Sequence, residues 1–133
     1  MTKQELCDKA VSMLDMAYAP YSHFRVGAAL ECDDGTVYTG CNIENASYTP
    51  SNCAERTAVF KAVSEGHRSF VRIAIAAETE RFTAPCGVCR QVLAEFDPEL
   101  KMEVILVNRS GETFSRPLKD FFPYSFDSSF LDK

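Results

Sequence analysis

The chain has 133 residues, of which 46% are hydrophobic and 25% charged, and its 14 Lys and Arg against 19 Asp and Glu give a formal net charge of −5. This composition excludes a disordered or collagen-like chain, and the length suits a single domain over residues 1–133 with an ordinary core. An acidic balance without a run of Lys or Arg argues against a nucleic-acid partner and favours a small, weakly charged substrate.

The first part of the chain predicts a helix followed by a β-hairpin. Thr2 and Glu5 form a capping-box pattern, and apolar residues then recur at helical spacing until Pro20 ends the run. Turn-forming residues at 33–35 separate two segments of strand-like alternation. The predicted elements here are the helix after Thr2, strands at 25–31 and 36–41, and a polar, ordered loop at 42–52.

Helical and strand-like segments alternate in the rest of the chain. Gly66 suits the position just after a helix, and Asp97-Pro98 ends another helix. The predicted elements are a helix at 53–63, a strand at 70–77, a helix at 87–96, strands at 102–107 and 113–115, and a last helical turn at 117–122. This order predicts an α/β fold, a three-layer α/β/α sandwich in which helices cover both faces of a mixed five-stranded sheet.

The C-terminal segment is rich in aromatic residues, from Phe121 to Phe126 and again at Phe130. Apolar side chains bring little benefit where a chain end frays. Two explanations remain open: the segment is buried against another subunit, or it folds back onto its own domain.

The cysteines point to buried packing, metal binding or catalysis rather than to disulfides. No apolar stretch reaches the ~20 residues that span a bilayer, and no signal peptide is visible, so we expect a cytoplasmic protein with no membrane partner. Thiols stay reduced in that compartment. The six cysteines are Cys7, Cys32, Cys41, Cys53, Cys86 and Cys89.

Three of the cysteines are placed to share one metal ion. Cys53 and Cys86 each begin a predicted helix, where unpaired backbone N–H groups stabilise a thiolate, and Cys89 lies on the same helix face as Cys86. The chain between Cys53 and Cys86 is long enough to bring the two helix starts side by side. Three thiolates favour zinc and leave its fourth position to water. A further ligand would close the site into a structural one, and the candidates are Cys7, Cys32, Cys41 and the isolated His23 and His67.

Glu55 lies two positions after Cys53, so its carboxylate can lie beside the open position of such a metal. A carboxylate next to zinc-bound water is what general acid/base hydrolysis needs. The alternative is a Glu that only interacts favourably with the helix N-terminus.

The segments Cys53-Ala54-Glu55 and Pro85-Cys86-Gly87-Val88-Cys89 together resemble the signature of zinc nucleoside and nucleobase deaminases, in its three-cysteine form. The similarity to the small homotetrameric cytidine deaminases covers nearly the whole chain and is weakest from Asn108 onward. It also rests on Phe24 and on the segments 19–22, 26–29, 40–46 and 53–58.

The resemblance implies the fold of that family and the hydrolytic deamination of cytidine and deoxycytidine to uridine and deoxyuridine, a reaction of pyrimidine salvage. It makes Cys53, Cys86 and Cys89 the ligands of one zinc ion per chain. It makes Glu55 the proton shuttle, which protonates ring N3 and later the departing amine while zinc hydroxide attacks C4. The substrate-binding positions that it implies are Phe24 on the pyrimidine ring, Asn42 and Glu44 at the ribose hydroxyls, Ala54, Tyr48, and Phe126 from an adjacent subunit of a homotetramer.

Arg56 lies where it could offset the negative charge of a zinc site made of three thiolates. Three thiolates and Zn²⁺ sum to −1, and a bound hydroxide makes the site more negative, which weakens the metal as a Lewis acid. Arg56 could donate hydrogen bonds to the thiolate sulfurs and offset this charge. The alternative is an ordinary surface arginine on a helix.

Three other functions remain in competition with this one. A related deaminase could act on a pyrimidine nucleotide or an aminonucleoside antibiotic. For a nucleotide, however, we would expect more Lys or Arg near the pocket than this sequence has. A zinc-stabilised interaction module would have a closed site. A redox protein with a CxxC motif would not need Glu55 or the third cysteine.

Overall fold

The computed structural model describes residues 1–131 of the chain. Five strands form one sheet in the order β2-β1-β3-β4-β5, in which only β3 and β4 are parallel neighbours. The elements are α1 (Lys3–Ser12), β1 (Val26–Cys32), β2 (Val37–Cys41), α2 (Ala54–Ser64), β3 (Phe70–Ala77), α3 (Gly87–Glu95), β4 (Glu103–Val107) and β5 (Thr113–Pro117), with short 3₁₀ helices at Met13–Met16, Leu118–Asp120 and Ser128–Leu131.

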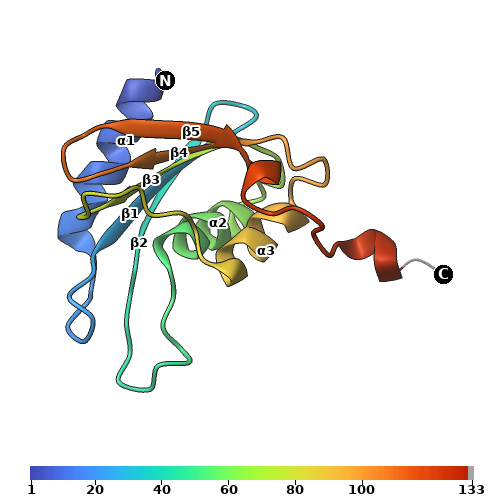
Figure 1. The fold of residues 1–133 in the computed structure, drawn as a ribbon. Helices are drawn as coiled ribbons and strands as arrows, with labels where there is room; N and C mark the ends of the chain where they lie inside the picture. Colours follow the sequence, from blue (N-terminus) through green and yellow to red (C-terminus); the bar gives the residue numbers. More distant parts are fainter. Residues whose placement is uncertain (132–133) are drawn as a thin grey trace.

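Helices cover both faces of the sheet, with α1 on one face and α2 and α3 on the other (Figure 1). On the α1 face, Leu6 and Ala10 pack with Ala29 and Ala74 of the central strands. On the other face, alternate residues of the same strands, among them Leu30, pack with α2 and α3. Strands buried on both faces need apolar side chains at nearly every position. The predicted α/β three-layer architecture with a mixed five-stranded sheet is therefore confirmed.

The strand directions bring the starts of two helices together. Because β2 and β3 are both antiparallel to β1, they run parallel to each other. The chain enters α2 after β2 and α3 after β3. Both helices therefore begin at the same edge of the sheet, where the carboxyl ends of β2 and β3 lie.

The end of β2 lies unusually close to the first turns of α2. A Cβ atom added to Gly40 would lie 2.3 Å from the carbonyl oxygen of Ala54 and 2.6 Å from the nitrogen of Ala58, so only glycine fits there. The Thr57 hydroxyl lies 3.0 Å from the carbonyl oxygen of Cys41, the last residue of β2. These contacts fix the start of α2 against the sheet.

The observed elements differ from the predicted ones mainly at their ends. The first α-helix ends at Ser12, and the chain continues as a 3₁₀ helix over Met13–Met16. The predicted last helical turn at 117–122 is partly strand, since β5 extends to Pro117 and a 3₁₀ helix covers only Leu118–Asp120. A helix long and apolar enough to cross a membrane is absent from residues 1–131.

Candidate active site

Three cysteine thiols meet at the edge where α2 and α3 begin. Cys53 is the N-cap residue of α2, Cys86 is the N-cap residue of α3, and Cys89 lies in the first turn of α3. Their sulfur atoms lie within 4.8 Å of one another, and those of Cys53 and Cys86 are 3.7 Å apart. The cluster joins residues 33 positions apart in the sequence, as the spacing predicted.

The cluster has the donor set of a zinc site. Three soft sulfur ligands suit Zn²⁺, and the helix starts favour their ionised form. A hydrogen bond from the Cys89 thiol lowers the pKa of Cys53 to about 5, and the same bond together with burial raises the pKa of Cys89. Within residues 1–131, the cluster contains no fourth His, Cys, Asp or Glu ligand. The described residues therefore offer a metal ion three protein ligands here, without a fourth that would close the site.

Arg56 extends from the first turn of α2 to the thiol cluster. Its Nη2 donates a hydrogen bond of 3.3 Å to the sulfur of Cys53. Its Nε is buried and has no hydrogen-bond partner among the described residues. A guanidinium placed against sulfur in this way matches a cluster of thiolates rather than of neutral thiols.

Glu55 is almost fully buried, with 4% of its surface exposed, and it lies one residue into α2. Burial raises the pKa of its carboxyl to about 7, and the charge on Cys53 acts in the same direction. A carboxyl with this pKa can both accept and donate a proton near neutral pH.

A cavity of about 400 Å³ opens beside the cluster. Its walls are mostly apolar, as in most sites for small organic ligands. The lining residues are Ser22, Phe24, Val26, Asn42, Glu44, Cys53, Ala54, Glu55, Ile75, Thr83, Ala84 and Cys86.

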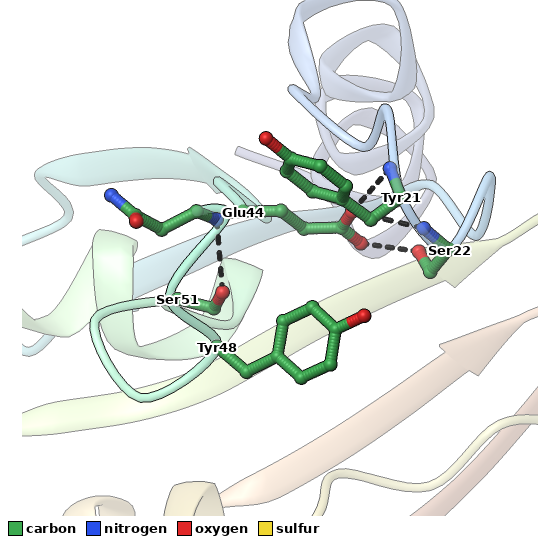
Figure 2. Close-up of a pocket in the computed structure, with 6 residues that line it drawn as sticks. Tyr21, Ser22, Glu44, Tyr48 and Ser51 are labelled. Carbon is green, nitrogen blue, oxygen red and sulfur yellow. Dashed lines mark hydrogen bonds between the residues drawn. The ribbon is translucent and has the colours of Figure 1, made fainter.

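Asn42 and Glu44 present hydrogen-bonding groups to this cavity. The Asn42 amide donates to the carbonyl oxygen of Phe24 at 2.7 Å and accepts from the nitrogen of Val26 at 2.9 Å, and its second N–H has no partner within residues 1–131. The Glu44 carboxylate accepts hydrogen bonds from the backbone nitrogens of Tyr21 and Ser22, both at 3.0 Å, and from the Ser22 hydroxyl (Figure 2). The Ser22 hydrogen bonds lower the pKa of Glu44, so it is ionised at neutral pH.

Ser22 is a site residue to which the sequence analysis assigned no role. Its hydroxyl donates to Glu44 and accepts from the nitrogen of Phe24 at 3.0 Å, so it connects two of the expected substrate-binding residues. In the sequence, Ser22 was indicated only as part of the segment 19–22, one of the segments on which the family resemblance rests.

Tyr48 and Phe126 do not line the cavity beside the thiol cluster. Tyr48 is 77% exposed and lines a neighbouring cavity of about 330 Å³, which shares Ser22 and Glu44 with the first one (Figure 2). Phe126 is 52% exposed and stacks on Phe130. Its carbonyl oxygen accepts a hydrogen bond from Gln91 of α3, and beyond this point the C-terminal segment leads away from the sheet (Figure 1).

Comparison with known proteins agrees with this geometry. Residues 1–105 match the family model for the cytidine and deoxycytidylate deaminase zinc-binding region. The chain is 47% identical to a cytidine deaminase of Sporosarcina psychrophila, over 98% of this chain and 96% of the relative. It is 49% identical to a cytidine deaminase of Halalkalibacterium halodurans, over 95% of both chains.

A solved structure gives the same result. The crystal structure of a cytidine deaminase from Burkholderia pseudomallei superposes with a TM-score of 0.90 at 47% identity, over 95% of this chain and 100% of that one. The family match and the thiol cluster confirm the prediction of a zinc cofactor. The chain therefore belongs to the cytidine and deoxycytidylate deaminase family.

Proposed function

We propose that this protein is a zinc-dependent enzyme that deaminates cytidine and deoxycytidine to uridine and deoxyuridine, consuming water and releasing ammonia. The observation that carries the proposal is the cluster of Cys53, Cys86 and Cys89, two of whose members, Cys53 and Cys86, line one cavity with the buried Glu55. The names of the relatives at 47% and 49% identity support the choice of substrate.

The reaction exchanges the amine at C4 of cytosine for the oxygen of water. Cys53, Cys86 and Cys89 hold the zinc ion, which when bound supplies the Lewis acidity that makes water a nucleophile near neutral pH. Glu55 takes a proton from the attacking water and delivers it to ring N3, then moves the second proton to the departing amine. Burial of this carboxyl raises its pKa above the ordinary value, which favours proton transfer in both directions.

Other residues hold the nucleoside and tune the site. Phe24 packs against the pyrimidine ring, and Ala54, which lines the same cavity, contacts the substrate. Asn42 and Glu44 offer a donor and an acceptor to the ribose hydroxyls. Arg56 withdraws negative charge from the sulfur ligands through its hydrogen bond to Cys53.

We further propose a homotetramer that acts in pyrimidine salvage in the cytoplasm. Phe126, Phe130 and Leu131 are more than half exposed, which favours burial of the C-terminal segment against another subunit. Phe126 would then close the cavity of a neighbouring chain, and Tyr48, which lines a cavity with Glu44 of its own chain, would help to close the site there. Sedimentation of the native protein and of Phe126→Ala tests the assembly. Cell fractionation tests the location.

The deaminase activity is tested with the zinc-loaded protein. Cytidine, deoxycytidine, cytidine monophosphate and an aminonucleoside antibiotic are each incubated with the enzyme, and loss of the cytosine absorbance and release of ammonia are followed. We expect turnover of the two pyrimidine nucleosides. Zinc-loaded protein that releases ammonia from neither nucleoside would overturn the proposal.

A further inference from the structure

A second group of metal-ligating side chains lies far from the active site. The sulfur of Cys32, the carboxylate of Asp34 and the imidazole of His67 bring one ligand atom each within 4.8 Å of the others. Cys32 ends β1, whereas Val26, at the other end of that strand, lines the active-site cavity. Six residues of extended chain separate the two sites by about 20 Å. His67 was expected to be isolated, and this contact corrects that expectation.

The three side chains come from two segments that backbone hydrogen bonds hold together. Cys32 and Asp34 lie at the β1–β2 turn, and His67 lies in the loop between α2 and β3. The nitrogen of Asp33 donates to the carbonyl oxygen of Ser69 at 3.0 Å, and the nitrogen of His67 donates to that of Ala62 at 3.0 Å. Both segments are thus fixed independently of the three side chains.

Hydrogen bonds also orient two of the ligand groups. One carboxylate oxygen of Asp34 accepts from the nitrogen of Thr36 at 3.0 Å, and the other lies 3.1 Å from Nε2 of His67. Nδ1 of His67 is 3.0 Å from the Tyr38 hydroxyl. Metal-binding histidines commonly have their second ring nitrogen hydrogen-bonded in this way, which sets the orientation of the ring.

We propose that Cys32, Asp34 and His67 form a second zinc site, in addition to the one in the active site. A thiolate, an imidazole and a carboxylate are a common ligand set for Zn²⁺, and three protein ligands leave one position for water. Cys32 is buried and Asp34 is exposed, so the ion would enter from the Asp34 side, and the Cys32 thiol would release its proton to solvent. The bound ion would fasten the β1–β2 turn to the loop that follows α2.

The proposal is tested by counting zinc. The purified chain is equilibrated in a zinc buffer at micromolar free Zn²⁺ and desalted, and metal is measured per chain by mass spectrometry. We expect two zinc ions in the native protein and one in Cys32→Ser and His67→Gln. Asp33→Asn, which removes the adjacent carboxylate of the same turn, is the matched control and should keep both. Tyr38→Phe should weaken the second zinc by roughly 10- to 100-fold, the usual effect of removing such a hydrogen bond.

Two further measurements separate this site from the active site. Cytidine turnover should be unchanged in Cys32→Ser and His67→Gln, and Cys86→Ala should still bind one zinc. His67 is only half-buried, so His67→Gln provides the test if Cys32→Ser does not fold. One zinc per native chain, or two in both variants, would overturn the proposal.

Discussion

Arg56 donates a hydrogen bond of 3.3 Å from its Nη2 to the sulfur of Cys53. The arginine lies three residues after the cysteine on the first turn of α2, so the helix itself places the guanidinium beside the ligand. A positive group at this position removes electron density from sulfur and offsets the negative charge that three thiolates give to a zinc site.

Replacing Arg56 with Gln is expected to lower kcat for cytidine by about 10- to 100-fold while zinc stays bound, because the ion then becomes a weaker Lewis acid. Arg116, exposed on β5, is the matched control, and Arg116→Gln should leave kcat unchanged. If native and Arg56→Gln enzymes have equal kcat, Arg56 does not raise the reactivity of the site by offsetting the charge of the thiolates.

Glu55→Gln is expected to lower kcat by about 10²- to 10⁴-fold, the usual contribution of a general acid/base, with zinc content unchanged. Gln has the same shape and cannot carry the proton. Cys86→Ala should instead lose the active-site zinc. Metal analysis of the two variants therefore distinguishes a residue that binds the ion from a residue that transfers the proton. Native turnover in Glu55→Gln would contradict the role assigned to this residue.

Burial of Glu55 makes a specific prediction about pH for the zinc-free protein. Its folded-state pKa of about 7 lies above the ordinary value of 4.5, so the folded state binds more protons between these two pH values. This contribution to stability is therefore complete below pH 4.5 and is lost as the pH rises to about 7, by about 3 kcal/mol.

Urea unfolding of zinc-free protein at a series of pH values measures this loss. Because Cys53 titrates in the same range, the quantity compared is the free energy of unfolding of the native chain minus that of Glu55→Gln. We expect this difference to fall as the pH rises. A difference that stays constant would mean that the carboxyl is not desolvated.

Ser22→Ala is expected to raise KM for cytidine by about tenfold with a smaller change in kcat, because Glu44 loses a charge-assisted hydrogen bond and Phe24 loses a backbone partner. Ser22→Thr, which keeps the hydroxyl, should recover much of the affinity. Ser12, whose hydroxyl bonds the backbone of α1, provides the control Ser12→Ala. An unchanged KM in Ser22→Ala would show that Glu44 needs no such support.

Gly40→Ala is expected to destabilise the chain by about 1–3 kcal/mol, the usual cost of overpacking, because the new methyl group meets the backbone of Ala54 and Ala58. Gly87→Ala is the matched control for stability, since a Cβ there has no described atom within 4 Å. Urea denaturation of the two variants gives the comparison. Equal stability of the two variants would contradict the close approach of β2 to α2.

The order of elements could be predicted because apolar periodicity changes clearly between helix and strand along this chain. Turn residues also mark the boundaries: Gly35 and Gly66 both adopt positive φ angles, as their predicted positions require. The ends of elements were less predictable. Residues 13–16 keep the helical apolar pattern but adopt a 3₁₀ helix, a change in hydrogen bonding that the pattern does not report.

The thiol cluster could be predicted because Cys53 and Cys86 each start a helix, Cys89 follows one turn after Cys86, and the crossover brings the two helices to one edge of the sheet. The contact between Ser22 and Glu44 could not, because it joins two irregular segments 22 residues apart whose paths depend on tertiary packing. For the same reason His67 gave no sign in the sequence of its approach to Asp34, 33 residues away. The path of the C-terminal segment could not be predicted either, because Phe126 and Phe130 are more than half exposed in the single chain and apolar periodicity does not place such residues.

In the proposed active site, three sulfur ligands hold the zinc and leave one position open beside Glu55. Zinc-edge X-ray absorption on Cys32→Ser protein loaded with one ion per chain tests it most directly. We expect three sulfur neighbours at about 2.3 Å and one lighter oxygen neighbour, which is replaced when a nucleoside analogue binds. Four sulfur neighbours, or a fourth ligand from the protein that no nucleoside analogue displaces, would contradict it.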